Sequence, residues 1–534
     1  MKSVIKVPFL KLQLKLTIIL FSALTMCGAY AQESVNKKSP NIVYILCDDL
    51  GYGDVQCLNP DRGKIATPNM DQLRSEGMSF TDAHSSSSVC TPSRYSVLTG
   101  RYAWRTHLQA RVLSGNGKPL IESGRLTVGG LLKQHGYTAA AIGKWHLGLN
   151  YDSNDYSKVI TDGPLQHGFD YFFGIAGSAD MPPYDFIEND HFTQIPSVQK
   201  QFPSLTYGSV SKRGPARLGP AAPDYEAENV LPTITTKAVD YLDERGKDKK
   251  PFFLYLALPS PHTPLVPSKE WQNKSGLGPY GDFVMQTDWA LGEVMKAIEK
   301  AGLNKNTMVI FTSDNGVAPY IGVHELEALG HYPSAEFRGY KLDIWEGGHR
   351  VPFFVRWPGK IKANSQSNEV ICLSNLLATS AELVGAKLPD NAGEDSFSLL
   401  PTILEKTNKQ QSHAIVNHSW TGRFAIRQGN WKLELCPGSG GTGGAGELTG
   451  PDAIAAGLPP IQLYNIHEDL AEKVNLQHQD PKIVASLTKL LEQYVANGRS
   501  TPGKPQRNDV PIDIWKKQLN EQPLTKAKNK NEGE

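Results

Sequence analysis

Two pairs of adjacent polar residues in this chain each follow a short apolar run. The pairs are Asp48-Asp49 and Asp314-Asn315. Three carboxylates and one amide oxygen form an all-oxygen set, which suits a hard cation, and calcium tolerates an irregular oxygen cage better than magnesium does. No histidine or cysteine spacing typical of zinc accompanies these residues. The sequence therefore predicts one metal ion, Ca²⁺ in preference to Mg²⁺, held by these four side chains.

Basic side chains lie after other apolar runs or in short motifs that contain glycine or proline. They are Arg94, Lys144, His146, His262 and Lys341. Taken alone, a lysine is usually a solvated surface charge and a histidine is usually structural. Together, and beside a metal ion, these groups would neutralise a tetrahedral oxyanion such as sulfate or phosphate.

The elements that must position these groups alternate between strands and helices. Buried strands are predicted at 41–46, 138–142, 252–258 and 308–312. Helical patterns lie between them at 70–76, 126–135, 234–245 and 282–301. This alternation predicts an α/β fold with a large mixed, mostly parallel sheet flanked by helices. Because ligands bind beyond the carboxyl ends of such strands, we expect the acidic and basic groups to meet at one edge.

The pattern changes after about residue 412. Short strands are predicted at 413–419, 423–427 and 431–435, then a glycine-rich loop at 437–450 and a helix at 482–497. This pattern predicts a smaller C-terminal subdomain, an antiparallel sheet with a packed helix. We therefore expect a catalytic domain over 40–411, the subdomain over 412–516 and a disordered tail over 517–534.

The N-terminus has the features of a signal peptide over residues 1–31. Lysines precede an apolar run at 16–26, and Ala29-Tyr30-Ala31 forms a small-x-small cleavage site. The apolar run is shorter than the roughly 20 residues that span a bilayer. We expect export to the periplasm or the exterior, cleavage near Ala31 and no stable insertion into a membrane.

The overall composition excludes some classes of partner. The chain has 534 residues, of which 40% are hydrophobic and 20% charged, with a formal net charge of +1. Such a balance indicates a globular protein without a strong overall electrostatic field. We therefore expect no nucleic-acid partner, and any selectivity for anions must come from a local site. After loss of the signal peptide, five cysteines remain: Cys47, Cys57, Cys90, Cys372 and Cys436. An odd number in an exported protein singles out a thiol for a separate role.

Cys90 is that thiol. It lies in the segment Ser87-Ser-Val-Cys90-Thr-Pro92-Ser-Arg94, and a cysteine with proline at +2 and arginine at +4 resembles the modification signature of sulfatases. Further segments similar to that family are 48–54, 143–148, 313–316, Lys341 and 346–348. The chain thus resembles the formylglycine-dependent (type I) sulfatases of the alkaline phosphatase superfamily, in particular arylsulfatase-like and N-acetylgalactosamine-6-sulfatase-like members.

The resemblance implies an alkaline phosphatase-like fold, and it implies roles for individual residues. Cys90 would be oxidised to Cα-formylglycine by a maturation enzyme and would complete the metal shell of Asp48, Asp49, Asp314 and Asn315. Arg94 would orient the formylglycine, and His146 would contact its hydroxyl. The sulfate and leaving-group oxygens would be bound by Lys144, His262 and Lys341, with further substrate contacts from Ser178 and Asp180.

The implied reaction is hydrolysis of a sulfate ester on a sulfated carbohydrate. One hydroxyl of the aldehyde hydrate would attack sulfur, His262 would protonate the departing alcohol, and His146 would take a proton as sulfate leaves. Galactose 6-sulfate or N-acetylgalactosamine 6-sulfate is the expected substrate, while the oligomeric state and endo or exo action stay open.

Two other functions fit the same residues. One is a phosphatase or phosphonate monoester hydrolase of the same superfamily, and the other is a non-catalytic binder of sulfated glycans with an unconverted Cys90. Aromatic and charged residues beyond Arg94 would either grip a sugar or pack inside the fold: Arg101, Trp104, Arg105, His107 and the segment 180–190.

Overall fold

The computed structural model describes residues 39–204, 216–406, 413–517 and 519. The described residues from Asn41 onward belong to one compact unit. The predicted signal peptide lies outside the described residues, as does almost all of the predicted tail. No helix in the described part of the chain combines the length and the apolar character needed to span a membrane.

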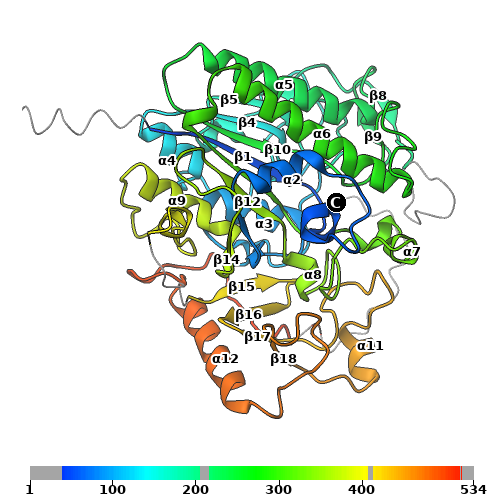
Figure 1. Ribbon diagram of the computed structural model, residues 1–534, viewed down its shortest axis with the longest axis vertical. Coiled ribbons are helices and arrows are strands. Elements are labelled where there is room, and N and C mark those ends of the chain that lie inside the picture. The colour runs from blue at the N-terminus through cyan, green and yellow to red at the C-terminus, as the bar shows by residue number, and fades with distance from the viewer. Residues whose placement is uncertain (1–38, 205–215, 407–412, 518, 520–534) are drawn as a thin grey trace, which may run out of the picture. The chain divides into compact units, whose positions relative to one another are not determined.

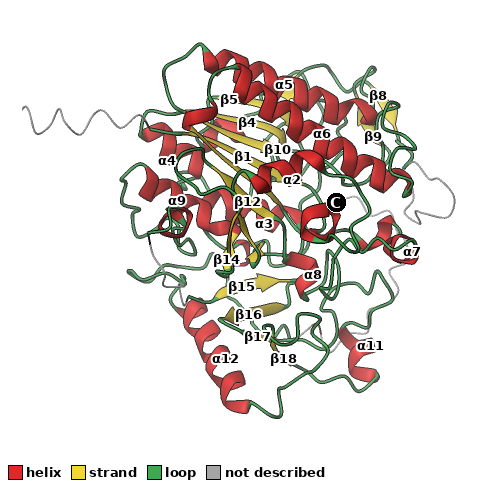
Figure 2. Ribbon diagram, viewed as in Figure 1, coloured by secondary structure: helices red, strands yellow, loops and turns green. Residues whose placement is uncertain are grey.

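A ten-stranded mixed sheet forms the centre of this unit, in the order β13-β2-β12-β11-β1-β10-β4-β5-β6-β7 (Figures 1 and 2). Five neighbouring strands of this sheet are parallel: β11 (Thr307–Ser313), β1 (Asn41–Cys47), β10 (Phe252–Ala257), β4 (Thr138–Lys144) and β5 (Tyr171–Ile175). Leu46 of β1 aligns with both Ala257 and Thr312, so the carboxyl ends of β1, β10 and β11 lie at the same edge. The predicted α/β sheet and its four predicted strands are confirmed.

The flanks of the sheet were not predicted. Antiparallel pairing adds β12 (Phe353–Arg356) to β11, and β6 (Ile187–Glu188) to β5. The remaining strands are β2 (Met78–Phe80), β13 (Ser365–Ser367) and β7 (His191–Phe192). Most of these segments have two to four residues, too few for a hydrophobic period to identify them.

Alternation of side chains along β1 divides the core into two layers. Val43 and Ile45 pack with α2 (Pro68–Ser75), α5 (Val230–Gly246) and α6 (Gly278–Lys300). Tyr44 and Leu46 face the other way, toward three further helices: α3 (Cys90–Thr99), α4 (Val128–Gln134) and α9 (Leu376–Leu383). Figure 1 shows α5 and α6 side by side across the sheet. The central strands are therefore buried on both faces, which explains their continuous apolar runs.

A four-stranded antiparallel sheet follows toward the C-terminus. It comprises β15 (Ile415–His418), β16 (Phe424–Gln428), β17 (Trp431–Glu434) and β18 (Gln462–Asn465), and α12 (Pro481–Ala496) packs against it. The sequence predicted the first three strands and the helix, but not β18. Tyr102 and Trp104 from the preceding part of the chain belong to the same hydrophobic cluster.

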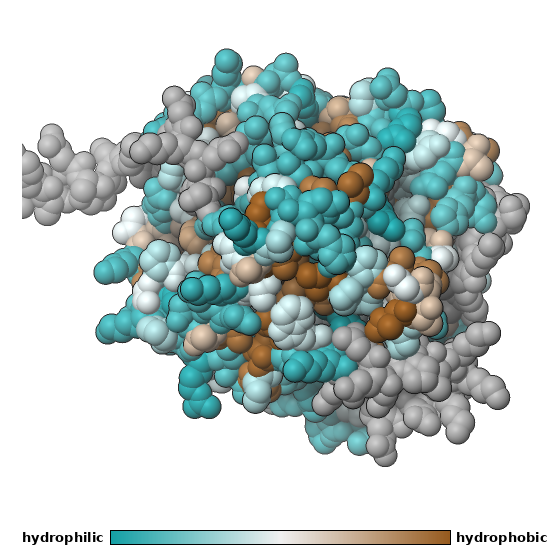
Figure 3. All heavy atoms as spheres, turned by 90° about the horizontal axis from the view of Figure 1, so that it is seen from below, coloured by the Kyte–Doolittle hydropathy of each residue, from teal (hydrophilic) through white to brown (hydrophobic). Residues whose placement is uncertain are grey.

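The shorter α-helices are α7 (Val323–Ala328), α8 (Glu346–His349), α10 (Leu400–Ile403) and α11 (Gly450–Ala455). The small pairs β3–β14 (Ala83–His84, Ile371–Cys372) and β8–β9 (Val198–Lys200, Gly219–Ala221) are separate from both sheets. On the face seen in Figure 3, hydrophobic residues form small groups between hydrophilic ones.

Candidate active site

The polar groups predicted to follow the central strands do meet at one edge. Asp48 follows β1, Asp314 follows β11, and Lys144 is the last residue of β4. His262 follows β10 after a short turn, in which the carbonyl of Ser260 accepts the Asp48 N–H at 3.0 Å. These four side chains are buried. Four strands thus supply one enclosed cluster of charged and polar groups.

The backbone around this cluster takes conformations that L-residues rarely adopt. Asp49 has φ 65° and His146 has φ 54°. Left-handed backbone at a non-glycine residue costs on the order of 1–3 kcal/mol and is found at functional sites more often than elsewhere. Gly143 has φ 113°, and a Cβ there would lie 1.9 Å from the carbonyl oxygen of Ala257 on β10. Only glycine therefore fits immediately before Lys144.

Two lysines neutralise the acidic pair. Lys144 Nζ lies 2.8 Å from Asp48 Oδ2. Lys341 Nζ lies 2.5 and 2.7 Å from the two carboxylate oxygens of Asp49. Burial would raise the pKa of Asp48, but Lys144, His262 and Arg94 together hold it well below its ordinary value. The Asp48 carboxylate is therefore ionised and able to act as a ligand.

Arg94 joins two of the acids from the opposite side. Its Nη2 lies 2.7 Å from Asp314 Oδ2 and 3.4 Å from Asp48 Oδ1, and its Nη1 donates to the carbonyl of Lys144. Burial raises the pKa of Asp314 to about 6, with Arg94 opposing this rise and Asp48 adding to it. The guanidinium thus contacts carboxylates directly, in addition to lying on the same helix as Cys90.

Cys90 begins α3 and lies among these groups. Its Sγ is 3.6 Å from Asp48 Oδ1 and 3.5 Å from Lys341 Nζ. Burial raises the pKa of the thiol to about 12, although Lys144 and Lys341 counteract that rise. A nucleophilic cysteine needs a lowered pKa, because the thiolate is the reactive form. As a plain thiol, Cys90 would therefore be unreactive despite its position. All five cysteines in the described part of the chain are free thiols.

The oxygen-rich side of the cluster is suited to a cation. Asp48, Asp49, Cys90 and His262 each offer a ligand atom within 4.8 Å of the others. Asp314 adjoins them, since its Oδ1 accepts the Asp49 N–H at 3.3 Å.

Asn315 is the fourth oxygen donor of the predicted set. It donates from Nδ2 to Asp49 Oδ1 at 2.8 Å. Its buried Oδ1 has no hydrogen-bond partner among the described residues. An orphaned amide oxygen beside three carboxylates fits a hard divalent cation.

The two histidines adopt defined orientations. Nδ1 of His262 donates to the carbonyl of Thr263 at 2.6 Å, which leaves Nε2 facing Asp49 Oδ2 at 3.6 Å. Nε2 of His146 donates to the carbonyl of Leu113 at 2.7 Å, and its buried Nδ1 has no partner among the described residues. Burial lowers the pKa of both imidazoles. Each histidine is thus neutral and keeps one ring nitrogen able to accept a proton.

The remaining predicted contacts differ in their surroundings. Ser178 is buried, and its hydroxyl has no hydrogen-bond partner within the described residues. Asp180 Oδ2 lies 3.9 Å from Arg217 Nη1. Both residues lie in the segment that follows β5 (Tyr171–Ile175), the next parallel strand of the sheet.

Three of the residues beyond Arg94 pack inside the fold, Arg101, Trp104 and Arg105, whereas His107 is exposed. Arg105 forms two hydrogen bonds of 2.7 Å with Asp395, Arg101 lies 3.0 Å from Asp509, and Trp104 is fully buried. Of the two roles left open for this segment, the geometry favours packing for these three residues. Tyr184 of the segment 180–190 is also buried.

Glycines bring the loop that carries Lys341 close to the acidic loop. The Gly316 N–H donates to the carbonyl of Gly348 at 3.0 Å, and the Lys341 N–H donates to Val317 at 2.8 Å. A Cβ at Gly316 would lie 1.9 Å from the Gly347 oxygen. The glycines of the motif 346–348 therefore have a packing role, which holds Lys341 beside Asp49.

Sequence reasoning missed the loop around Leu113. Its carbonyl accepts from His146, and its N–H donates to Oγ1 of Thr91, the residue after Cys90, at 3.2 Å. Both contacts to Leu113 use backbone atoms, so no side-chain pattern identifies them.

Comparisons with known proteins agree with this geometry. The profile of the sulfatase family matches residues 40–386. An N-acetylgalactosamine-6-O-sulfatase of Bacteroides thetaiotaomicron is 34% identical over 88% of this chain and 96% of its own length. Human arylsulfatase A is 33% identical over 82% of this chain and 83% of its own.

A solved structure from work on the metabolism of multiple glycosaminoglycans by Bacteroides thetaiotaomicron superposes with a TM-score of 0.76. It is 32% identical and covers 86% of this chain and 99% of its own. These matches favour sulfate-ester hydrolysis over the phosphatase alternative and over a non-catalytic binder. The chain belongs to the sulfatase family and is a sulfuric ester hydrolase.

Proposed function

We propose that this sulfatase removes sulfate from carbohydrates, with Cys90 converted to formylglycine and with one calcium ion bound beside it. The position of Cys90 carries the proposal. Its Sγ lies between Asp48 and Lys341 in a buried cluster, and burial raises the pKa of the thiol to about 12. Modification explains why a buried cysteine with a raised pKa lies between a carboxylate and a lysine of the site.

The metal would be held by Asp48, Asp49, Asp314 and Asn315, with residue 90 completing the shell. All four donors offer oxygen, and this set favours calcium over zinc. When bound, the ion supplies positive charge that stabilises negative charge on the transferring group, and the formylglycine hydrate supplies the attacking hydroxyl.

The protein's own side chains would bind the ester and move protons. Lys144 and Lys341 approach Cys90 from β4 and from the 341 loop, so together they can hold the oxygens of a sulfate. Arg94 keeps Asp48 and Asp314 in place and orients residue 90. His146, with an unpaired Nδ1, is the proposed proton acceptor as sulfate leaves.

His262 is the proposed acid for the leaving alcohol. Its proton lies on Nδ1, where it bonds the Thr263 carbonyl. The free Nε2 faces the cluster and must therefore take up a proton before it can donate one. Ser178 and Asp180 would add contacts to the sugar.

The proposed substrate is a 6-sulfated galactose or N-acetylgalactosamine. The relatives named for N-acetylgalactosamine 6-sulfate support it, since one of them matches over 96% of its own length at 34% identity. The signal-peptide pattern of residues 1–31 supports export, which brings the enzyme to extracellular polysaccharides. A formylglycine-generating enzyme is the proposed maturation partner.

The test is release of inorganic sulfate from a panel of sulfated monosaccharides and glycan fragments, with conversion at Cys90 verified by peptide mass. Matched phosphate esters and a calcium-chelated sample run in parallel. We expect release from a 6-sulfated sugar that chelation abolishes and that calcium restores. Release from sugars sulfated only at other positions would overturn the 6-sulfate assignment. Full activity of protein that retains the thiol at Cys90 would overturn the formylglycine assignment.

A further inference from the structure

A cavity adjoins the candidate active site through the loop that follows Leu113. Its volume is about 360 Å³, which lies within the range of roughly 300–1,000 Å³ of small-molecule sites. The residues around it are Ser114, Gly115, Asn116, Tyr151, Ser153, Tyr156, Met181, Pro182, Pro183, Arg217 and Pro220.

Two walls of the cavity are tied to catalytic residues. Leu113, which precedes the first wall, is bonded through its backbone to Thr91 and His146 at 3.2 and 2.7 Å. Met181, in the second wall, donates its N–H to the carbonyl of Ser178 at 2.9 Å. The walls touch where Gly115 meets Pro182, since a Cβ on that glycine would lie 2.1 Å from the proline oxygen. Backbone hydrogen bonds therefore connect both walls of the cavity to residues of the candidate site or their immediate neighbours.

The lining combines apolar rings with one charge. Tyr151 and Tyr156 have ring centroids 5.9 Å apart, and both pack against Phe192. The buried hydroxyl of Tyr151 has no hydrogen-bond partner among the described residues. Tyrosine rings beside two exposed polar residues, Ser114 and Asn116, suit a pyranose, which has both apolar faces and hydroxyl edges.

Arg217 is the one charged residue in this described lining. Its side chain is 55% exposed, and its Nη1 lies 3.9 Å from Asp180 Oδ2. Its backbone is fixed by the hydrogen bond from its N–H to the Asp180 carbonyl at 3.1 Å. The acids of the neighbouring loop, Asp152 and Asp155, lie 2.7 and 3.6 Å from Lys158. The guanidinium is therefore positioned at the cavity with donors available for a planar or tetrahedral anion.

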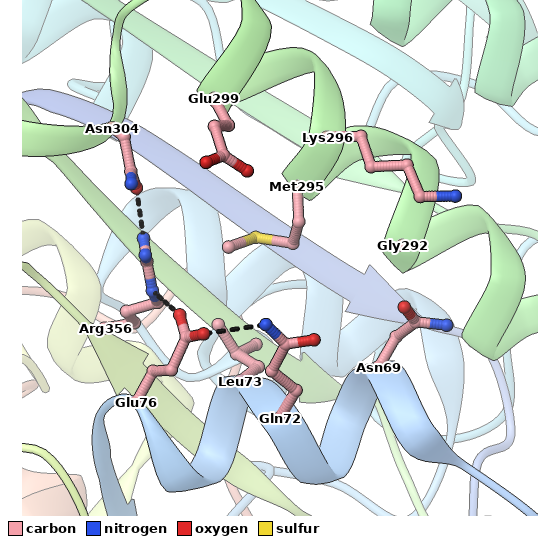
Figure 4. A pocket seen from close by; sticks show the side chains of 10 residues that line it. All are labelled: Asn69, Gln72, Leu73, Glu76, Gly292, Met295, Lys296, Glu299, Asn304 and Arg356. Atoms are coloured by element: carbon pink, nitrogen blue, oxygen red, sulfur yellow. Dashed lines mark hydrogen bonds and ion pairs between the residues drawn. The ribbon is translucent and has the colours of Figure 1, made fainter.

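A second cavity, between α2 and α6, also contains an arginine, but this arginine is already paired (Figure 4). There, Arg356 lies 2.6 Å from Glu76 and donates to Asn304 at 2.7 Å, while Gln72 donates to the same glutamate. Its arginine is already paired with an acid in hydrogen-bond contact.

We propose that the cavity lined by Arg217, Tyr151 and Tyr156 is a subsite for a sugar unit that carries a second anionic group, a carboxylate or a sulfate ester. This inference rests on the proposed function and refines it, because the substrate becomes an acidic oligosaccharide instead of an isolated sulfated sugar. Arg217 is a specificity residue that binds the second anion, and the tyrosine rings contact the sugar ring.

The experiment compares two disaccharides that both carry a 6-sulfated N-acetylgalactosamine. In one the neighbouring sugar is a uronic acid, and in the other its carboxyl group is reduced to an alcohol. A third disaccharide with a second sulfate in place of the carboxylate distinguishes the two sources of negative charge. Converted wild-type enzyme, Arg217→Gln and Lys296→Gln are assayed for kcat and KM separately. Lys296 is a matched control, since it is an exposed cation on α6 with 71% side-chain exposure.

We expect Arg217→Gln to raise KM about tenfold for the doubly anionic substrate, the size of one lost charge-assisted hydrogen bond. Its kcat, and both constants for the reduced disaccharide, should stay at the wild-type values, and Lys296→Gln should change nothing. An equal effect of Arg217→Gln on both disaccharides, or no effect on either, would overturn the subsite while the sulfatase proposal stands. Failure of wild-type enzyme to release sulfate from any 6-sulfated substrate would overturn both.

Discussion

At the scale of single residues, the cluster contains two kinds of polar group. Asp48 forms ion pairs with Arg94 and Lys144, and Asp49 forms one with Lys341. The buried atoms Asn315 Oδ1 and His146 Nδ1 have no hydrogen-bond partner among the described residues. An unpaired buried polar atom costs roughly 1–3 kcal/mol, so a ligand that bonded either atom would remove that cost.

Replacement of Cys90 tests the chemistry assigned to it. Cys90→Ser supplies a single hydroxyl, which can accept a sulfuryl group but cannot expel sulfate by forming a carbonyl. We expect it to lose multiple turnover and to retain covalently bound sulfate, detected by the mass of the peptide that contains residue 90. Cys90→Ala should be inactive, carry no sulfate and give an unchanged circular dichroism spectrum. Steady multiple turnover by Cys90→Ser would contradict the assignment.

The oxygen donors predict stabilisation by calcium that can be measured without any substrate. A ligand that binds only the folded state stabilises it by about 2.7 kcal/mol at 100 times its Kd. We expect calcium to raise the melting temperature of the chelator-treated protein, and Asn315→Ala to weaken this rise because one donor is lost. Asn154→Ala, in an exposed loop, serves as the control and should respond like wild type. An equal response of Asn315→Ala would exclude its side chain from the metal shell.

The sequence predicted those site residues whose side chains form motifs, because a strand that ends in Asp-Asp or Gly-Lys leaves a local pattern. It did not predict Arg217 or Leu113. Arg217 lies near the site only because the folded chain brings its N–H to the carbonyl of Asp180. Leu113 contacts His146 through its backbone carbonyl. Neither relation is local in the sequence. The sequence also left the role of Arg105 open, and only its pairing with Asp395 distinguishes a packing residue from a sugar contact.

At the scale of elements, the site depends on close approaches between loops. The acidic loop after β11 and the loop that carries Lys341 touch at Gly316 and Gly347. Their backbones are joined by the bonds from Gly316 to Gly348 and from Lys341 to Val317. The glycines of this motif therefore allow the two loops to approach each other closely and supply no chemical group to the site.

Gly316→Ala tests this contact. The added Cβ would lie 1.9 Å from the Gly347 oxygen, so one loop must move. We expect a loss of about 1–3 kcal/mol in the free energy of unfolding and a fall in kcat, because Asn315 and Lys341 are displaced. The control is Gly130→Ala in α4, where the new Cβ makes only a 3.4 Å contact with Thr127 and helix propensity improves. Chemical denaturation should show it as stable as wild type or more so, and a harmless Gly316→Ala would disprove the close approach.

At the scale of the whole molecule, the hydrophobic periodicity of the sequence was sufficient to predict the buried parallel strands and the C-terminal sheet with its helix. It was insufficient to predict the short flanking strands and β18, where pairing depends on distant neighbours. The division near residue 411 stays a prediction. Contacts cross it, because Tyr102 and Trp104 share a hydrophobic cluster with the C-terminal strands.

A buried charge network also crosses this division. Lys432 of β17 lies 3.2 Å from Glu346 of α8 and 2.7 Å from Glu472, and Arg427 of β16 lies 3.3 Å from Glu346. Burial would raise the pKa of Glu346, but Lys432, His84, Arg427 and Arg350 together hold it well below its ordinary value of 4.5. A carboxyl group in contact with Lys432, Arg427 and Arg350 belongs to a structural ion-pair network, although it lies close to His84 and His349.

Glu346→Gln should therefore destabilise both parts of the described unit at once. Breaking a buried ion pair by removing one partner costs about 3–5 kcal/mol. Because the pKa of Glu346 is lower in the folded than in the unfolded state, its contribution is fully present above the unfolded value of about 4.5 and is lost as the pH falls through the folded value. We expect the difference between wild type and variant in denaturant unfolding to be largest near neutral pH and to shrink below pH 4.5.

The control for this prediction is Glu293→Gln, which breaks the exposed pair between Glu293 and Lys296 and should change stability by less than about 0.5 kcal/mol. If the network couples the two sheets, the wild-type protein and both variants unfold in single transitions that coincide by circular dichroism and by tryptophan fluorescence. A Glu346→Gln protein that unfolds in two separated steps would instead mean that the C-terminal sheet folds on its own. In that case the network joins two domains but does not contribute to a common stability.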